Sequence, residues 1–193
     1  KTALLFAFEL ANENAKKNQN EKDKVLKIFD FLLLNNADVN YSFNSIDLRF
    51  STYTPLIAAC LIPEGNDKCF KQTIIEKILN SKKLTTSDEV SIFTKSNQEY
   101  QITPLAYLCT LNRDEKYQEC IDTLLDRADV NKTIKIGNFE GQIVQYLCAN
   151  YDKTKIDIIK SLIQAGADID SSFTYKNETL IPLICAVRSK DND

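Results

Sequence analysis

Two stretches decide the fold, Thr54-Pro55-Leu56-Ile57-Ala58-Ala59-Cys60 and Thr103-Pro104-Leu105-Ala106-Tyr107-Leu108-Cys109. A Thr hydroxyl can accept a hydrogen bond from a free N–H in the first turn of a helix, and Pro at the first helical position gives up no hydrogen bond. Each stretch is therefore predicted to open a helix. Their recurrence marks an internal repeat, which changes every later inference about the chain.

Weaker copies of this opening occur at residues 2–8, 142–148 and 181–187. A second pattern follows four of the five openings, where adjacent pairs of apolar residues recur four positions apart. The pairs are Ile28/Phe29 with Leu32/Leu33, Ile74/Ile75 with Ile78/Leu79, Cys120/Ile121 with Leu124/Leu125, and Ile158/Ile159 with Leu162/Ile163. This spacing places the four side chains of each set on one face of a helix. Each unit is thus predicted to hold a first helix, a loop, a second helix and an extended finger.

These units resemble ankyrin repeats, whose signature is Thr-Pro-Leu-His-x-Ala in the first helix and Gly-Ala-Asp-Val-Asn after the second. The related endings here are residues 36–40, 128–131 and 166–170. The resemblance covers essentially the whole chain and implies an all-α fold, an ankyrin-type helical solenoid of about five repeats with extended finger hairpins. The position of the family's His differs, since it holds Leu5, Ile57, Ala106, Gln145 and Ile184.

The repeats are longer than those of the family. Their anchor positions are 39 to 52 residues apart, against about 33 in ankyrin proteins. Part of the extra length falls in the fingers, residues 41–53, 85–102, 132–141 and 171–180. These mix aromatic, β-branched and polar residues, so we expect them to pair as hairpins, with Gly137-Asn138 suited to a turn.

Residues 1–193 are predicted to form a single ankyrin-repeat domain. The chain opens inside one helix motif and stops after another, so we expect a fragment of a longer protein. A net charge of -3 with interspersed signs argues against nucleic-acid binding. No apolar run approaches the roughly 20 residues that span a bilayer, so we expect no membrane insertion.

Six cysteines invite a metal or disulfide interpretation, yet no Cys-x-x-Cys pair occurs and the chain has no His. Four of them lie in first helices at positions where small residues are typical, so we interpret them as buried hydrophobes. Reduced thiols indicate a reducing compartment, and we expect a cytoplasmic location.

Signals of catalysis are nearly absent from the chain. Without His, the usual acid–base group near neutral pH and the Ser/His and Cys/His dyads are missing. Four glycines form no phosphate-binding loop. We therefore expect no enzyme activity, no catalytic residues, no metal site and no cofactor.

The resemblance also implies a partner-binding surface, because ankyrin proteins present the residues before the first-helix Thr and at the finger tips to a partner protein. By position these are Arg49, Phe50, Tyr53, Tyr100, Phe139, Phe173 and Tyr175. Aromatic and Arg side chains often anchor interfaces. The alternative is that these rings only pack finger against finger.

Two asparagines also carry alternatives, because Asn40 and Asn131 occupy the Asn of the ankyrin ending. That Asn is a target of hydroxylation in animal cells. We favour a turn residue that bonds its own backbone.

Three functions remain open at this point. The first is a protein–protein interaction module that presents an ankyrin groove and finger loops to a partner. The second is a targeting or regulatory array of a larger multidomain protein, such as a secreted effector of an intracellular microbe, which would act in the host cytosol. The third is a structural spacer, and fold alone does not choose among them.

Overall fold

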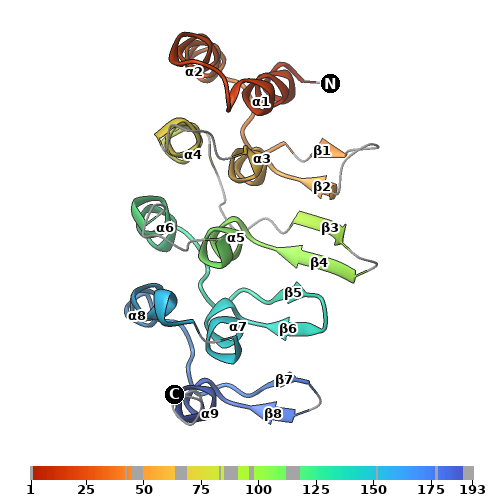
Figure 1. Cartoon of the computed structure of the whole chain (residues 1–193), viewed down its shortest axis with the longest axis vertical. Helices are drawn as coiled ribbons and strands as arrows, with labels where there is room; N and C mark the ends of the chain where they lie inside the picture. Colours follow the sequence, from red (N-terminus) through yellow and green to blue (C-terminus); the bar gives the residue numbers. More distant parts are fainter. Residues whose placement is uncertain are drawn as a thin grey trace.

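The computed structural model is a stack of helix pairs with β-hairpins projecting on one side (Figure 1). It describes residues 2–41, 43–44, 50–63, 69–82, 84, 91–95, 98–111, 118–150, 152–176 and 178–188. The first helices are α1 (Ala3–Asn14), α3 (Pro55–Leu61), α5 (Pro104–Leu111), α7 (Ile143–Ala149) and α9 (Pro182–Arg188). The second helices are α2 (Gln19–Leu34), α4 (Cys69–Leu79), α6 (Gln118–Leu125) and α8 (Ile156–Gln164), the last preceded by the 3-10 turn η1 (Lys153–Lys155). The helices expected from the two sequence patterns are thus confirmed.

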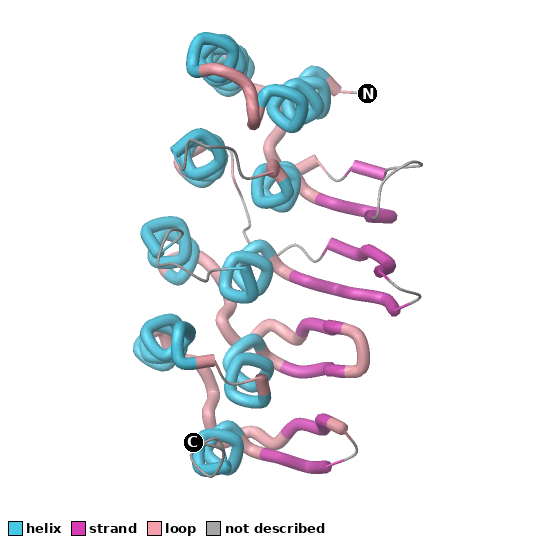
Figure 2. The backbone as a smooth tube through the Cα atoms, viewed as in Figure 1, coloured by secondary structure: helices cyan, strands magenta, loops and turns pink. Residues whose placement is uncertain are grey.

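The fingers form hairpins that join into one sheet. The strands are β1 (Phe43–Asn44), β2 (Phe50–Tyr53), β3 (Ser91–Lys95), β4 (Gln98–Ile102), β5 (Ile134–Ile136), β6 (Phe139–Gly141), β7 (Phe173–Tyr175) and β8 (Glu178–Leu180). Successive hairpins also pair with each other, for example where Tyr100 of β4 lies opposite Ile136 of β5. All eight strands therefore make one antiparallel sheet in chain order (Figure 2).

The predicted all-α class, an ankyrin-type helical solenoid, is wrong because of this sheet. The chain is a mixed α/β structure in which the sheet runs the length of the stack beside the first helices. The sequence predicted hairpins one at a time, from local turn and strand residues. Pairing between hairpins joins residues more than thirty positions apart, such as Tyr100 and Ile136, and leaves no local signal in strands of only two to five residues.

Local capping explains where the first helices begin. The hydroxyl oxygens of Thr2, Thr54 and Thr103 accept hydrogen bonds from the N–H groups three residues later, at 3.3, 3.3 and 3.2 Å. Pro55 and Pro104 occupy the first helical position, as predicted. These bonds satisfy N–H groups that a helix terminus otherwise leaves without a partner.

Two of the second helices, α2 and α8, end in left-handed residues that turn the chain toward the next hairpin. Asn36 after α2 has φ of 64°, and Gly166 after α8 has φ of 91°. The following N–H groups return to the last helical turn, from Ala37 to Leu32 O and from Ala167 to Leu162 O, each at 2.9 Å. This pairing of hydrogen bonds is the Schellman arrangement, and it reverses the chain direction at the C-terminal ends of α2 and α8.

The core is continuous along the stack. Apolar side chains from every first helix and every second helix are buried in one cluster, which includes Phe29, Ile78, Leu124 and Leu162. Each helix pair therefore depends on its neighbours for burial, as expected of a repeat array. Over the described part of the chain, no helix is both long enough and apolar enough to cross a membrane.

The cysteines of the first helices lie in this core, as predicted. Cys60, Cys109, Cys148 and Cys185 are buried free thiols, and so is Cys120 of α6; the side chain of Cys69 lies outside the described residues. Burial raises the pKa of Cys60 and Cys109 to about 12. The neutral thiol is thus the stable form at these positions, which suits a packing role.

Polar side chains also link successive repeats. The ammonium of Lys155, which is buried, donates to Cys109 O at 2.9 Å at the end of α5. The carboxamide of Asn131 donates to Gly166 O at 3.1 Å and accepts from the Asp168 N–H at 2.8 Å. The Asn131 side chain therefore bonds the turn of the next repeat, which corrects the expectation that it bonds its own backbone.

Candidate protein-binding surface

Four aromatic rings gather where the sheet meets α7. The ring of Phe139, in β6, lies at the centre and contacts Tyr146 of α7 at 5.2 Å between centroids. It also contacts Phe173 at 5.8 Å and Tyr175 at 6.2 Å, both in β7. All three contacts are edge-to-face, the geometry that aromatic quadrupoles favour. We call these four residues the aromatic cluster.

The backbone just before α7 brings the cluster together. Phe139 precedes the helix by four residues, with Gly141 between them in β6. A Cβ atom at Gly141 would lie 2.4 Å from Gln145 Oε1 and 3.0 Å from Phe139 Cζ. Only glycine therefore lets the strand approach both side chains this closely.

The Gln145 side chain bonds two segments on either side of this close approach, the start of α7 and the segment just ahead of β7. Its Oε1 accepts the N–H of Gln142 at 2.8 Å. Its Nε2 donates to Ser171 O and Ser171 Oγ, at 3.2 and 2.8 Å, just ahead of β7. Only half of a capping box forms, because Oε1 of Gln142 is buried without a hydrogen-bond partner. The carboxamide at this position thus fixes β7 and its aromatic residues against α7.

The cluster has a buried base and a partly exposed rim. Phe139 and Phe173 are 1% and 6% exposed, while Tyr146 and Tyr175 are half-buried. The hydroxyl of Tyr175 donates to Asn150 Oδ1 at 2.9 Å, at the end of α7. Lys176 places its ammonium 5.1 Å from the Tyr175 ring centroid. The rim therefore combines ring faces with phenol hydroxyls.

A third tyrosine belongs to this rim. The pKa of Tyr146 is raised, first by burial and then by the nearby phenols of Tyr175 and Tyr100. Tyr100 lies in β4 opposite Ile136, which lies opposite Phe139, so Tyr100 and Phe139 share one face of the sheet. Tyr100 of β4, Tyr146 of α7 and Tyr175 of β7 thus lie near one another around Phe139.

The structure divides the predicted binding residues. Tyr100, Phe139, Phe173 and Tyr175 are brought together at the cluster, whereas Tyr53 is buried in the core at 5% exposure. Arg49 and the side chain of Phe50 lie outside the described residues. Because Tyr53, Phe139 and Phe173 are buried, they take the alternative role of packing. Among the predicted residues whose side chains the structure describes, Tyr100 and Tyr175 contribute exposed surface.

Sequence reasoning missed Tyr146 and Tyr107. Both occupy the fifth position of the seven-residue opening motif, Tyr107 in α5 and Tyr146 in α7. Both are half-buried, between buried neighbours on either side. The signal was available, because aligning the openings shows a tyrosine recurring at a position that is otherwise variable.

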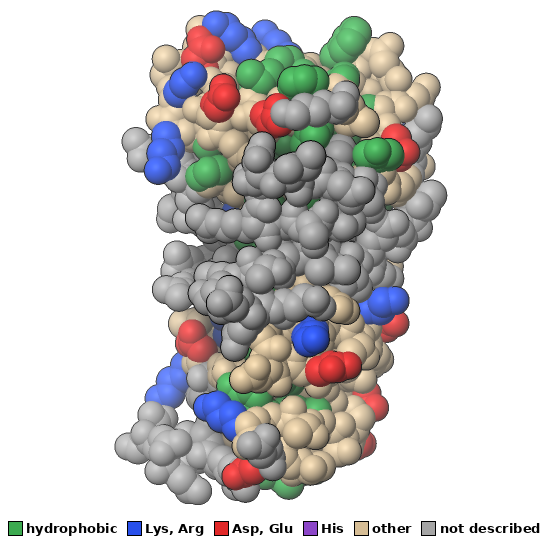
Figure 3. All heavy atoms as spheres, turned by 90° about the vertical axis from the view of Figure 1, so that its right-hand side faces the viewer, with side chains coloured by type: hydrophobic (Ala, Val, Ile, Leu, Met, Phe, Trp, Pro, Cys, Tyr) green, Lys and Arg blue, Asp and Glu red, His purple; other side chains and the backbone are tan. Residues whose placement is uncertain are grey.

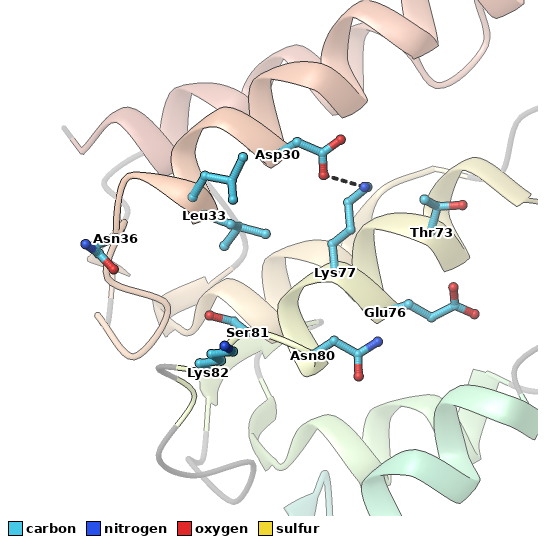
Figure 4. Close-up of a pocket in the computed structure, with 10 residues that line it drawn as sticks. Asp30, Leu33, Asn36, Thr73, Glu76, Lys77, Asn80, Ser81 and Lys82 are labelled. Carbon is cyan, nitrogen blue, oxygen red and sulfur yellow. Dashed lines mark hydrogen bonds and ion pairs between the residues drawn. The ribbon is translucent and has the colours of Figure 1, made fainter.

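A separate hollow lies between α2 and α4, on the side of the stack away from the hairpins. Its volume is 580 Å³, and Figure 4 shows Leu33 and the ion pair between Asp30 and Lys77 at its wall. Lys77 Nζ lies 2.5 Å from Asp30 Oδ1. Charges of both signs line the hollow, so it offers no net charge to a ligand.

The hairpin side of the molecule carries mixed charge. Figure 3 views this side and shows basic and acidic side chains interspersed over the lower half of the stack, with hydrophobic side chains between them. Across the described ranges, no group of three or more potential metal ligands occurs. No protein-family model matches the chain, and no curated protein is similar to it. A functional proposal therefore has to rest on the residues themselves.

Proposed function

We propose that the chain is a protein-interaction module whose partner binds the rim of the aromatic cluster. The observation that carries the proposal is that Tyr100 of β4, Tyr146 of α7 and Tyr175 of β7 are partly exposed and gather around Phe139. Tyrosine supplies a large contact area with few rotatable bonds, and it is enriched among the residues that dominate binding energy.

The construction beneath the rim supports this role. Phe139 and the Gln145 carboxamide hold the rim residues on rigid strands and a helix rather than on loops. A preorganised surface loses little conformational entropy when a partner binds. The resemblance of the openings to ankyrin motifs, which we offer as a proposal of kinship, points to the same class of function.

A structural spacer, the alternative that needs no partner, accounts less well for this surface. A spacer requires the buried base of Phe139 and Phe173 for its stability. Half-exposed phenols at equivalent positions of successive repeats, such as Tyr107 and Tyr146, contribute nothing that a spacer requires. These phenols leave apolar ring surface in contact with water, and recovering that surface on binding is favourable.

Selection of peptides on the immobilised chain tests the proposal. A random peptide library displayed on phage is panned against the wild-type protein, and the affinity of the best peptide is then measured. We expect Tyr146→Ala to weaken binding about fivefold or more, the effect of losing an interface aromatic. Tyr41→Ala is the matched control, because Tyr41 is exposed and lies near the other end of the chain.

Two results would contradict the proposal. One is a library from which no peptide is enriched above background, which is the outcome expected of a spacer. The other is an enriched peptide that binds Tyr146→Ala as tightly as wild type, which would move the site elsewhere, for example to the hollow beside Lys77. Thermal unfolding of each variant shows whether a weakened affinity reflects lost folding instead.

A further inference from the structure

The helix pair at one end of the stack, α1 and α2, exposes apolar side chains at positions that are buried in the other pairs. Ile28 of α2 is 37% exposed. The residues at the equivalent position of the other second helices are at most 2% exposed, namely Ile74, Cys120 and Ile158. Phe6 of α1 is 51% exposed, against 4% for Ala58 at the equivalent position of α3. These positions are thus covered inside the stack and open to water at the end that α1 and α2 form (Figure 1).

The exposed residues form one face across both helices. On each helix they are spaced three or four positions apart, so they share one side of it. All of them are exposed, and hydrophobic side chains are visible at this end of the stack in Figure 3. We call this set the end face, and its residues are Phe6, Leu10 and Glu13 of α1 and Lys24, Ile28 and Phe31 of α2. Exposed apolar side chains that lie together in this way are typical of interaction sites.

The two helices are aligned so that the aromatic residues of the end face lie at the same level. A short link, residues 15–18, joins α1 to α2, and such links connect antiparallel helices. The rings of Phe8 and Phe29 are in contact, with centroids 5.1 Å apart. Phe6 lies two positions before Phe8, and Phe31 lies two positions after Phe29. Phe6 and Phe31 therefore lie side by side across the end face.

The charged residues of the end face are aligned in the same way. Glu13 lies five positions after Phe8, and Lys24 lies five positions before Phe29. At 1.5 Å per residue, both lie about 7.5 Å along the helices from the Phe8–Phe29 contact, toward the link. The end face is thus apolar at one end and charged at the other, with the acid on α1 and the base on α2.

A second copy of the chain matches this pattern. A two-fold axis that runs parallel to the helices, midway between them, places α1 of each copy over α2 of the other at the same level. Three kinds of contact then form, each of them twice: Phe6 with Phe31, Leu10 with Ile28, and Glu13 with Lys24. A two-fold axis that runs across the helices would instead set Phe6 against Glu13 of the second copy, and a carboxylate covered by a ring loses its hydration. The first arrangement is therefore the favoured one.

Lys24 can join this interface and keep its present contact. Its ammonium lies 2.7 Å from Glu21 Oε1 of the same helix, and its side chain is 59% exposed. An ammonium has three N–H donors, so a carboxylate of the second copy can bind beside the first. Complementary charges at the rim of an interface fix the register of the partners and disfavour other arrangements.

We infer that two copies of the chain associate through the end face as a symmetric dimer, in which α1 of each copy packs on α2 of the other. The interface lies on the first helix pair and leaves the aromatic cluster beside α7 open. The inference thus goes beyond the proposed function and does not depend on it.

Sedimentation velocity of the whole chain over a wide range of concentrations tests the inference. We expect a species of twice the 22.0 kDa chain mass to form as the concentration rises. Phe31→Asp should weaken dimerisation at least about tenfold, because it sets a carboxylate against the Phe6 ring of the second copy. Leu183→Asp is the matched control and should leave the dimer unchanged, because Leu183 is 66% exposed, as Phe31 is 65% exposed, but lies in α9 at the other end of the stack.

Reversal of the charge pair tests how the two copies are arranged. Glu13→Lys and Lys24→Glu should each weaken the dimer about threefold or more, because each brings like charges together at two symmetry-related points. The double variant restores opposite charges and should regain most of the wild-type affinity. Both side chains are exposed, so this test holds even where Phe31→Asp unfolds the chain.

Three results would overturn the inference. A chain that stays monomeric at every concentration has no such interface. Dissociation of the dimer by Leu183→Asp would place the contact at the other end of the stack. A double charge variant that dimerises as weakly as either single variant would reject the packing of α1 on α2 of the second copy.

Discussion

The helix openings of α5 and α7 lie in neighbouring repeats and are held by different bonds. At α5 the cap is local, since Thr103 accepts the N–H of Ala106 within its own first turn. At α7 the cap is Gln145, a residue inside the helix that reaches back to Gln142 and forward to Ser171. The Thr103 cap thus serves its own helix alone, whereas the Gln145 carboxamide serves its own helix and also holds the segment ahead of β7. The aromatic cluster lies at the repeat where the cap does both.

Truncating the ring at the centre of the cluster tests this difference most strongly. Phe139→Ala should lower the free energy of unfolding by about 3–5 kcal/mol, the cost of removing a buried Phe. Tyr100 precedes Thr103, the N-cap residue of α5, by three residues, as Phe139 precedes Gln142, the N-cap residue of α7. Tyr100→Ala should cost clearly less, because Tyr100 is partly exposed. Denaturant unfolding measures both. Equal losses would mean that the two hairpins are packed alike.

Removing each cap separates the local bond from the shared one. Gln145→Ala should cost about 2–3 kcal/mol, because it removes hydrogen bonds from partly buried partners at two places, the start of α7 and the segment ahead of β7. Thr103→Ala should cost about 1 kcal/mol, the usual value for an N-cap. The comparison is made on the same unfolding curves. A Thr103→Ala variant as unstable as Gln145→Ala would show that the hydrogen bonds from Gln145 to Ser171 add nothing to the free energy of unfolding.

Filling the space beside Gln145 sharpens the same point. Gly141→Ala should cost about 1–3 kcal/mol, as overpacking does, because the new Cβ meets Oε1 of Gln145. In a Gln145→Ala background the same substitution should cost much less, since the obstructing group is gone. A double-mutant cycle measures the difference. If the losses of stability from Gly141→Ala and Gln145→Ala were additive, the strain caused by the new Cβ would lie elsewhere in the strand and not at Gln145.

The smallest effect concerns the turn that follows α8. Asp168 accepts from the N–H groups of Asp170 and Ser171, and these backbone bonds lower the pKa of its carboxyl. A lowered folded-state pKa stabilises the fold above the unfolded value of about 3.9, and the gain is lost as pH falls through the folded value.

Asp168→Asn should therefore be slightly less stable than wild type at pH 7, and the gap should close in acid. Thermal unfolding from pH 7 to pH 3 follows it. A gap as wide at pH 3 as at pH 7 would mean that the charge of Asp168 is not the stabilising feature.

The sequence predicted well the features that depend on residues close to one another in the chain. Thr54 and Thr103 cap helices, because capping bonds lie within a few positions. The paired apolar residues around Ile78 are buried, and so are Ile158 and Leu162 of the last set, whereas Ile163 of that set is exposed. The sheet between hairpins was not predictable, since strands of only two to five residues carry no register signal. The exposure of Phe139 was misjudged for a related reason, because its burial depends on Tyr146 and Tyr175 from other elements.

The sheet has a consequence for how the molecule would respond to force. Its strands lie across the long axis of the stack, so the hydrogen bonds between hairpins point along that axis. A pull on the two ends would stretch these bonds one strand pair at a time instead of shearing many together. We therefore expect the stack to extend under tension in small successive steps, each releasing one repeat, and to behave as a soft spring that refolds unit by unit when the tension is removed.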